Sequence, residues 1–391
     1  MIKKIILQSK IGFTIYKILI FLRRFLNKKK KIKLNLISDY EIIGKKKHQT
    51  FTGYYDVNFI SHDEKSMVYQ RKTESNNVNV EIILYDFKTD KKHKILDKTK
   101  AWSWQLGSRL QWIDNNTIFY NSVNNKNILE GIILNLKTKQ KRKIPYPLFS
   151  ISKNNKMALI LNFKILEQQR KGYGYNYNQK NKNKNEILVY DLINNKIIKK
   201  YNLKEINSDL SDDEFYFNHL SWSPNHSSFL VYVVRTQPRK TILYYFKNLY
   251  EFQKIDLIMQ ISHHEWISNT KIIFYGNIND KKQFYIFDFS NMKYKKIKHE
   301  YSLLDGHLNS VNKKNFIVDT YPDKYHNRHL YIYNIIEDKI QKLGEFFSCM
   351  DFKNDKKCDL HPTYSTKQRY ILFDTSHNGY RQVVLVRNLK K

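Results

Sequence analysis

A short pattern recurs seven times along this chain: an apolar run leads into a polar turn, and a second apolar run follows. The turns begin at Ser61, Asp114, Ser152, Ser223, Ser268, Asn312 and Ser365. A third apolar run comes next in each unit, and most units close with a short run that mixes lysine with apolar residues. β-Branched and aromatic residues between polar turns predict strands, and the units leave little room between them for helices.

Four strands per unit at a period of roughly 40–55 residues predict an all-β, seven-bladed β-propeller over residues 32–391. The seventh unit ends after its third strand, so we expect residues 33–43 to supply the missing outer strand and close the ring. One unit is stretched by residues 163–185, which contain Gly172, Gly174 and an Asn/Lys run. We interpret this stretch as a flexible insertion in blade three, either solvated or acting as a lid over a site.

One position of the repeat carries unusual chemistry. Three residues before the residue that leads into each turn stand Asp56, Arg109, Leu148, His219, His263, His307 and His361. With 13 histidines in 391 residues, roughly 0.2 would be expected by chance in seven positions. The first strand of a propeller blade is the innermost, so these side chains are predicted to converge on one end of the central channel.

The residue types in this ring indicate binding or catalysis. Imidazole serves as an acid, a base or a metal ligand near neutral pH. His307, Asp359 and His361 together offer a mixed nitrogen and oxygen set that suits manganese, zinc or iron. Arginines hold a carboxylate or phosphate with two parallel hydrogen bonds, and those near the repeat position are Arg109, Arg235, Arg239 and Arg381.

Aromatic residues near the inner strands have two interpretations. Trp102 and Trp104 precede an inner strand and are suited to stacking on a sugar ring. Trp222 and Trp266 instead occupy the regular position before the turn, which favours packing between blades.

Residues 1–31 form a separate element that we predict to be an amphipathic, apolar and basic helix. The longest run without an ionised side chain covers only residues 11–16, whereas a bilayer span needs about 20 apolar residues. We therefore favour a helix lying on an anionic membrane surface, with a signal anchor or an ordinary packed helix as alternatives. The positive charge that follows the apolar run places the propeller in the cytoplasm, peripheral to the inner face of the membrane.

The formal net charge of +33 raises the question of nucleic acid as a partner. Lysine supplies 57 of the 69 basic residues, and lysine, asparagine, isoleucine and tyrosine are all over-used, as biased codon choice would produce. We therefore interpret the charge as a solvated basic surface, with attraction to an acidic polymer or anionic membrane as the main alternative. Cys349 and Cys358 are too few for a disulfide framework.

Several segments of the last four units resemble the TolB-like propeller group that includes the oligogalacturonate lyases. These segments are residues 262–266, 305–307, 319–323, 358–362, 374–375 and 379–382. The resemblance implies a seven-bladed enzyme in which His263 assists proton abstraction, and in which His307 and His361 hold a cation that binds a uronate carboxylate. Residues 359–361 read Asp-Leu-His where the lyases have His-Pro-His, and the nearest counterparts of their catalytic arginine are Arg235 and Arg239.

These observations favour a metal-assisted, polysaccharide lyase-like enzyme that cleaves a uronate-containing saccharide by β-elimination. The predicted catalytic residues are His263, Arg235 and Arg239. The predicted substrate-binding residues are Asp56, Arg109, His219, Arg381 and Trp104, and the predicted metal ligands are His307, Asp359 and His361. The alternatives are transfer or processing of a lipid-linked glycan in surface polysaccharide biosynthesis, and a non-catalytic propeller that binds a partner.

Overall fold

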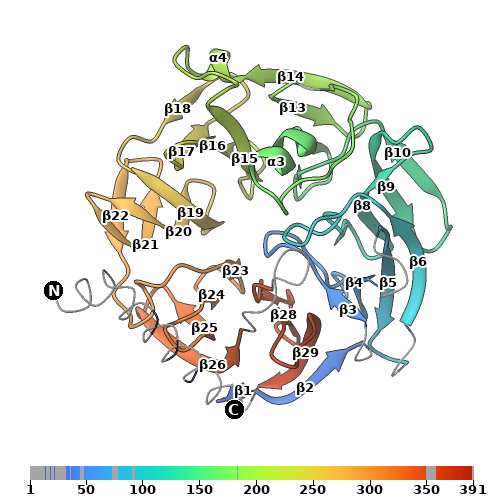
Figure 1. The fold of residues 1–391 in the computed structure, drawn as a ribbon, viewed down its shortest axis with the longest axis vertical. Coiled ribbons are helices and arrows are strands. Elements are labelled where there is room, and N and C mark those ends of the chain that lie inside the picture. The colour runs from blue at the N-terminus through green and yellow to red at the C-terminus, as the bar shows by residue number, and fades with distance from the viewer. Residues whose placement is uncertain are drawn as a thin grey trace.

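The computed structural model describes residues 32–35, 37–44, 48–72, 78–89, 93–182, 184–348 and 358–389, and the single positions Thr14, Ile18 and Leu22. Seven antiparallel sheets stand around a central channel like the blades of a propeller (Figure 1). The predicted all-β, seven-bladed β-propeller is confirmed.

Each blade has its innermost strand first in the chain. Blade one contains β3 (Gln49–Phe51), β4 (Ser66–Lys72), β5 (Val80–Asp86) and β6 (His93–Thr99). Blade two contains β7 (Gln111–Trp112), β8 (Thr117–Val123), β9 (Leu129–Asn135) and β10 (Lys141–Ile144). Blade three contains β11 (Ser150–Ile151), β12 (Met157–Ile160), β13 (Glu186–Asp191) and β14 (Lys196–Asn202). Blade four contains β15 (Phe215–Trp222), β16 (Phe229–Arg235), β17 (Lys240–Phe246) and β18 (Phe252–Lys254).

The remaining three blades follow the same order. Blade five contains β19 (Gln260–Trp266), β20 (Lys271–Ile278), β21 (Lys281–Asp288) and β22 (Lys293–Lys296). Blade six contains β23 (Leu308–Ser310), β24 (Asn315–Asp319), β25 (Asn327–Asn334) and β26 (Lys339–Phe347). Blade seven contains β27 (Thr363–Tyr364), β28 (Ile371–Thr375) and β29 (Gln382–Leu389).

The chain ahead of blade one joins the last two blades from outside. β2 (Ile37–Ile43) pairs antiparallel with β29 as the outer strand of blade seven. β1 (Ile32–Leu34) pairs antiparallel with β26 and adds a fifth strand to blade six. Residues 33–43, expected as one closing strand, are therefore divided between two blades, which covers two outer sheet edges instead of one.

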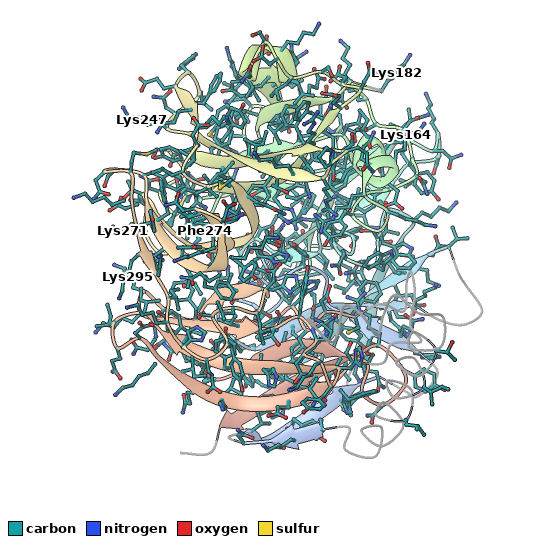
Figure 2. All side chains as sticks on the ribbon, turned by 60° about the vertical axis from the view of Figure 1, so that its left-hand side comes forward. Lys164, Lys182, Lys247, Lys271, Phe274 and Lys295 are labelled. Carbon is teal, nitrogen blue, oxygen red and sulfur yellow. The ribbon has the colours of Figure 1, made fainter. Side chains whose placement is uncertain are left out.

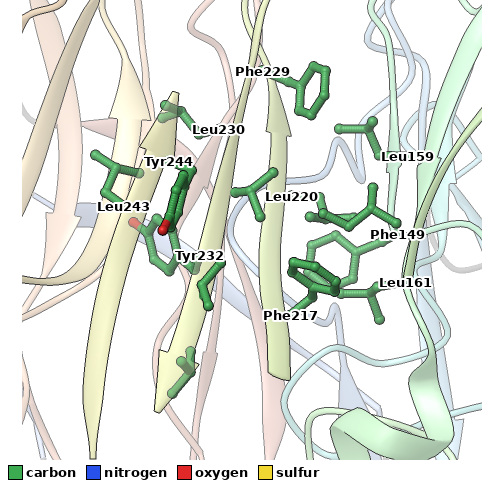
Figure 3. Packing of buried hydrophobic residues seen from close by; sticks show 14 of the residues in the cluster. Phe149, Leu159, Leu161, Phe217, Leu220, Phe229, Leu230, Tyr232, Leu243 and Tyr244 are labelled. Carbon is green, nitrogen blue, oxygen red and sulfur yellow. The ribbon is translucent and has the colours of Figure 1, made fainter. Parts of the chain in front are cut away.

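Apolar side chains fill the spaces between neighbouring blades. In the largest cluster, Phe149, Leu159 and Leu161 on blade three face blade four across the sheet interface (Figure 3). The indole of Trp266 donates a hydrogen bond to Ser221 Oγ of the preceding blade at 2.9 Å. The packing role predicted for Trp266 therefore agrees with its position between two blades.

Exposed lysines lie on the surface of the molecule, among them Lys182, Lys247, Lys271 and Lys295 (Figure 2). Within the part of the chain that the structure describes, no helix is both long and apolar enough to cross a membrane. The predicted helix of residues 1–31 lies outside the described residues except at Thr14, Ile18 and Leu22. Its membrane role and the predicted location therefore stay predictions.

The insertion in blade three begins with α3 (Phe163–Gln169), on the channel side of the blade (Figure 1). The side chain of Asn162 caps this helix by accepting hydrogen bonds from the backbone N–H groups of Lys164 and Ile165. Tyr175 then stacks on Phe163 with ring centroids 4.5 Å apart. A second short helix, α4 (Leu203–Ile206), follows β14.

Candidate functional site

The backbone of the inner strands is irregular at the repeated position of unusual chemistry. Arg109, His219 and His361 have φ angles of 57°, 46° and 45°, in the left-handed region. The register of β15 with β16 shifts at His219, and that of β19 with β20 shifts just before His263. A left-handed residue costs about 1–2 kcal/mol, and a bulge re-aims the side chain it carries. These irregularities set the inner strands apart from regular sheet at the candidate site.

His307, Asp359 and His361 form a buried group that could hold a metal ion. One ligand atom from each of the three lies within 4.8 Å of the other two. The Nε2 atom of His361 is 4.0 Å from Oδ2 of Asp359. The structure therefore brings together the three residues predicted as metal ligands.

Asp319 orients both histidines of this group. Its carboxylate accepts from Nδ1 of His307 at 3.0 Å, from the His307 backbone N–H at 2.7 Å and from the His361 backbone N–H at 3.1 Å. The Nδ1 atom of His361 donates to the carbonyl oxygen of Gly53 at 2.7 Å. Both Nε2 atoms are buried, and neither has a hydrogen-bond partner among the described residues. A ligating histidine shows this arrangement, with one nitrogen held and the other directed to the metal, so the residues fit a divalent cation.

Asp359 is held in place by two further side chains. Arg328 Nη2 donates to its Oδ1 at 2.6 Å, and Gln105 Nε2 donates to its Oδ2 at 2.8 Å. A carboxylate oxygen has two lone pairs, so these two hydrogen bonds do not by themselves prevent Asp359 from binding a metal. Sequence reasoning did not assign a role to Gln105, although it directly follows the predicted Trp104.

The two candidate ligand histidines favour the neutral form in the fold. Burial lowers the pKa of His307 well below its ordinary value, and the nearby His263 lowers it further. Burial also lowers the pKa of His361 well below its ordinary value, with His307 as the next cause. Neutral imidazole is the form that binds a metal, so the site is ready to accept one at neutral pH.

His263 lies next to the metal ligands and is paired with a carboxylate. Its ring centroid is 4.2 Å from that of His307, and its Nδ1 is 2.9 Å from Oδ1 of Asp305. Ser262 Oγ donates to the other oxygen of Asp305 at 2.8 Å. The Asp305 carboxylate fixes the imidazole with Nδ1 as the donor, which leaves Nε2 to accept a proton.

A cavity of about 420 Å³ adjoins the Asp305 side of this pair, and His263 itself does not line it. Asp305, Tyr321, Arg170, Arg239 and Lys282 are among the residues that line it. Burial raises the pKa of Tyr321, and the nearby Tyr173 and Asp359 raise it further, so its hydroxyl stays protonated at neutral pH.

The two arginines predicted as catalytic have different places. Arg239 lines the cavity and is exposed to solvent. Arg235 does not line it, and its guanidinium lies 3.6 Å from a carboxylate oxygen of Glu214. Of the two predicted residues, only Arg239 can reach a ligand in the cavity.

The insertion of blade three covers one side of this site. Tyr173 accepts a hydrogen bond from Gln105 Nε2 at 2.9 Å, which links the insertion to the residue that holds Asp359. Gly172 lies so close to Trp104 that a Cβ on this glycine would stand 1.9 Å from the indole. Trp104, predicted to bind a sugar, is therefore in contact with the insertion. Arg170 and Tyr173 escaped the sequence analysis, although both lie in the stretched unit.

Arg381, predicted to bind substrate, lies in the interior as a link between blades. Its guanidinium donates to Oδ2 of Asp374 at 2.7 and 3.1 Å and to the carbonyl oxygen of Trp104. The same carboxylate accepts from the backbone and side chain of Thr52 in blade one, both at 3.0 Å. Arg381 is 1% exposed, so its donors serve the closure of the ring.

Asp56, Arg109 and His219 were also predicted to bind substrate, and none of them belongs to the group of candidate metal ligands. Arg109 forms a bidentate pair with Asp56 at 2.7 and 3.0 Å. His219 Nε2 is 2.9 Å from the hydroxyl of Tyr54. Asp56 and His219 line a different cavity of about 480 Å³, whose walls come from all seven blades. Tyr54 and Tyr55 lie between this second cavity and the rings of His307 and His361.

Glu265 lines the second cavity and gives a pH-dependent prediction. Burial raises its pKa to about 7, and the nearby Asp56 adds to the rise while Lys153 opposes it. A carboxyl group whose pKa is raised by folding makes its full contribution to the stability of the folded protein below the pKa that it has in the unfolded chain. This contribution is lost as the pH rises through 7. We expect Glu265→Gln to raise the melting temperature over the wild type more at pH 8 than at pH 5. The gain at pH 8 is at most about 3 kcal/mol, since one pKa unit equals about 1.4 kcal/mol.

Calorimetry of both proteins at the two pH values tests this expectation. Glu251→Gln is the control, because hydrogen bonds from the side chains of Lys247 and Asn248 lower the pKa of Glu251. Its removal should give no gain at pH 8. An equal shift for Glu265→Gln at both pH values would contradict a raised pKa.

Comparisons with known proteins bear on the fold. No family model and no curated protein sequence matches the chain. Among solved structures, an oligogalacturonate lyase in complex with manganese has a TM-score of 0.66 at 11% identity, over 91% of this chain and 96% of that one. An oligogalacturonate lyase from Vibrio parahaemolyticus has a TM-score of 0.63 at 13% identity, over 91% and 96%. The β-propeller domain of the Trilobed protease from Pyrococcus furiosus has a TM-score of 0.52 at 12% identity, over 86% and 95%.

The relation suggested by the sequence thus holds in three dimensions along nearly the whole chain. At identities of 11–13% these matches show the fold, whereas the chemistry depends on the residues of the site. The chain has the seven-bladed β-propeller fold of the oligogalacturonate lyases.

Proposed function

We propose that this protein is a metal-assisted enzyme that cleaves a uronate-containing saccharide by β-elimination. The observation that carries the proposal is a pair of buried Nε2 atoms, on His307 and His361, next to Asp359 and the His263–Asp305 pair. Within the part of the chain that the structure describes, neither Nε2 atom has a hydrogen-bond partner. A site with metal ligands and a carboxylate-oriented imidazole side by side suits proton abstraction next to a carboxylate.

The chain's own residues supply the proton transfers. His263 Nε2 accepts the proton from the carbon α to the uronate carboxylate, and Asp305 stabilises the resulting imidazolium. The bond from the β-carbon to the glycosidic oxygen breaks as the double bond forms. Tyr321, protonated at neutral pH, donates a proton to the departing oxygen. The proton lost from carbon and the proton gained by oxygen balance.

Manganese, zinc or iron fits the ligand set of His307, Asp359 and His361. When bound, such a cation supplies charge stabilisation for the carboxylate as negative charge develops on it. The manganese in the solved lyase structure is consistent with this choice of metals.

The test uses purified full-length protein with Mn²⁺ and a panel of uronic-acid polymers, beginning with polygalacturonate. We expect the ultraviolet absorbance of the unsaturated uronate to rise with time. His263→Ala and Tyr321→Phe should each lower kcat by about 10²–10⁴-fold, the usual contribution of a general acid or base. His62→Ala is the control, because His62 is exposed and belongs to the second cavity.

No absorbance rise with any of these polymers in the presence of metal would contradict the β-elimination. Saccharide binding that survives the combined His263→Ala, His307→Ala and His361→Ala substitutions would favour the non-catalytic alternative instead.

A further inference from the structure

Three cationic side chains from three blades converge on the cavity of about 420 Å³ beside His263. Arg170 ends α3 in the insertion of blade three. Arg239 lies in the turn between β16 and β17 of blade four, and Lys282 lies in β21 of blade five. The cavity is therefore cationic because of the tertiary arrangement, since the three residues are far apart in the chain.

The described residues do not balance the positive charge of this cavity. Among the described residues, none of the three cations forms an ion pair, and Asp305 is the only carboxylate on the lining. The Asp305 carboxylate is already engaged, because its Oδ1 lies 2.9 Å from His263 Nδ1 and its Oδ2 accepts from Ser262 Oγ at 2.8 Å. Three positive charges against one negative charge leave a net charge of +2.

Arg170 is already held in a binding geometry. Its guanidinium lies 3.7 Å from the ring centroid of Tyr173, and its Nη2 donates to the Tyr173 hydroxyl at 2.8 Å. A guanidinium that is held flat loses little conformational freedom when it binds an anion, and its planar fork matches phosphate and carboxylate. The volume falls within the range of about 300–1,000 Å³ that is usual for ligand cavities.

We propose that this cavity binds a dianionic group of the saccharide, separate from the uronate that reacts beside His263. The net charge of +2 matches a phosphate or diphosphate, or a pair of carboxylates, better than a single carboxylate. The inference rests on the proposed function for the identity of the reacting sugar. The substrate class is then an acidic glycan that carries further negative charge, either as a diphosphate link to a carrier or as neighbouring uronates.

Isothermal titration calorimetry of metal-free protein tests this proposal without turnover. The probes are inorganic pyrophosphate for the diphosphate source and digalacturonate for the carboxylate source. We expect one of them to bind with one site per chain. Arg170→Gln and Lys282→Gln should each weaken that binding by about tenfold or more, because a charged hydrogen bond is worth about 1.5–3 kcal/mol. The affinity of Arg170→Lys should lie between those of the wild type and Arg170→Gln, since lysine keeps the positive charge but lacks the planar guanidinium.

Lys281→Gln is the matched control, because Lys281 is the exposed neighbour of Lys282 on the same strand and does not line the cavity. Tighter binding of pyrophosphate assigns the dianion to a diphosphate, and tighter binding of digalacturonate assigns it to uronates. No saturable binding of either probe, or equal weakening by Lys281→Gln, overturns the proposal. The titration measures binding to metal-free protein, whereas the proposed function is tested by turnover in the presence of metal. A failure of this proposal can therefore be distinguished from a failure of the proposed function.

Discussion

Replacing both His307 and His361 by alanine is expected to abolish divalent metal binding. Their Nε2 atoms are buried, have no hydrogen-bond partner in the residues that the structure describes, and lie close to Asp359, so they are the nitrogen donors of the candidate site. Residues that only orient ligands contribute about 10–100-fold to metal affinity, so loss of two ligands should weaken it by more than about 100-fold. Metal analysis after dialysis, and calorimetric titration with Mn²⁺ and Zn²⁺, measure the effect.

Asp319→Asn gives an intermediate variant for the same site. The asparagine amide has one acceptor oxygen where the carboxylate has two. It therefore loses contacts to the His307 ring or to the backbone N–H groups of His307 and His361. We expect metal affinity to fall about 10–100-fold while both ligands remain. His62→Ala should leave affinity unchanged, and circular dichroism checks that each variant folds. Full metal content in the double alanine variant would refute the assignment of these ligands.

Gly172→Ala is expected to displace the insertion of blade three from the site. Gly172 has a φ of 90°, and an added Cβ would stand 1.9 Å from Cε2 and 2.2 Å from Cζ2 and Nε1 of the Trp104 indole. The side chain of Trp104 cannot remain in place, so the contact between the insertion and blade two should open. Since Tyr173 links the insertion to Gln105, metal affinity should fall as well.

Limited trypsin digestion measures this opening, because Lys171 and Lys180 lie in the insertion. We expect cleavage there to speed up by about tenfold or more in Gly172→Ala. Gly379→Ala is the matched control: its φ is also 90°, but an added Cβ meets no atom within 4 Å. Both variants carry the left-handed strain of about 1–2 kcal/mol, so only the steric contact differs. Equal digestion of the two variants would show that the insertion does not depend on the Trp104 contact.

The seven-unit repeat could be recognised in the sequence because strand patterns depend on residues that are close together in the chain. Alternating apolar residues, polar turns and a regular period are set by neighbours a few positions apart, and they predicted seven blades. The same local register placed His263, His307 and His361 at equivalent inner positions. Their approach to one another follows from the fold, in which inner strands face a common channel.

The ion-pair partners of the charged residues at and near the inner positions could not be predicted in the same way. Arg381 pairs with Asp374, and Asp56 pairs with Arg109 from the next blade. An arginine in the sequence has the same chemistry whether it is free or already paired. Only the packing of blades decides which one keeps its hydrogen-bond donors for a ligand.

By itself, the sequence determined the propeller, the equivalence of the seven inner positions and the three candidate metal ligands, because each depends on local periodicity and residue chemistry. The tertiary structure decided that Asp56 and His219 belong to a second cavity, and that Gln105 and Asp319 hold the ligands. It also decided that Arg170, Arg239 and Lys282 share one cavity with Asp305. These contacts join residues far apart in the chain, and their geometry depends on how the blades and the insertion pack.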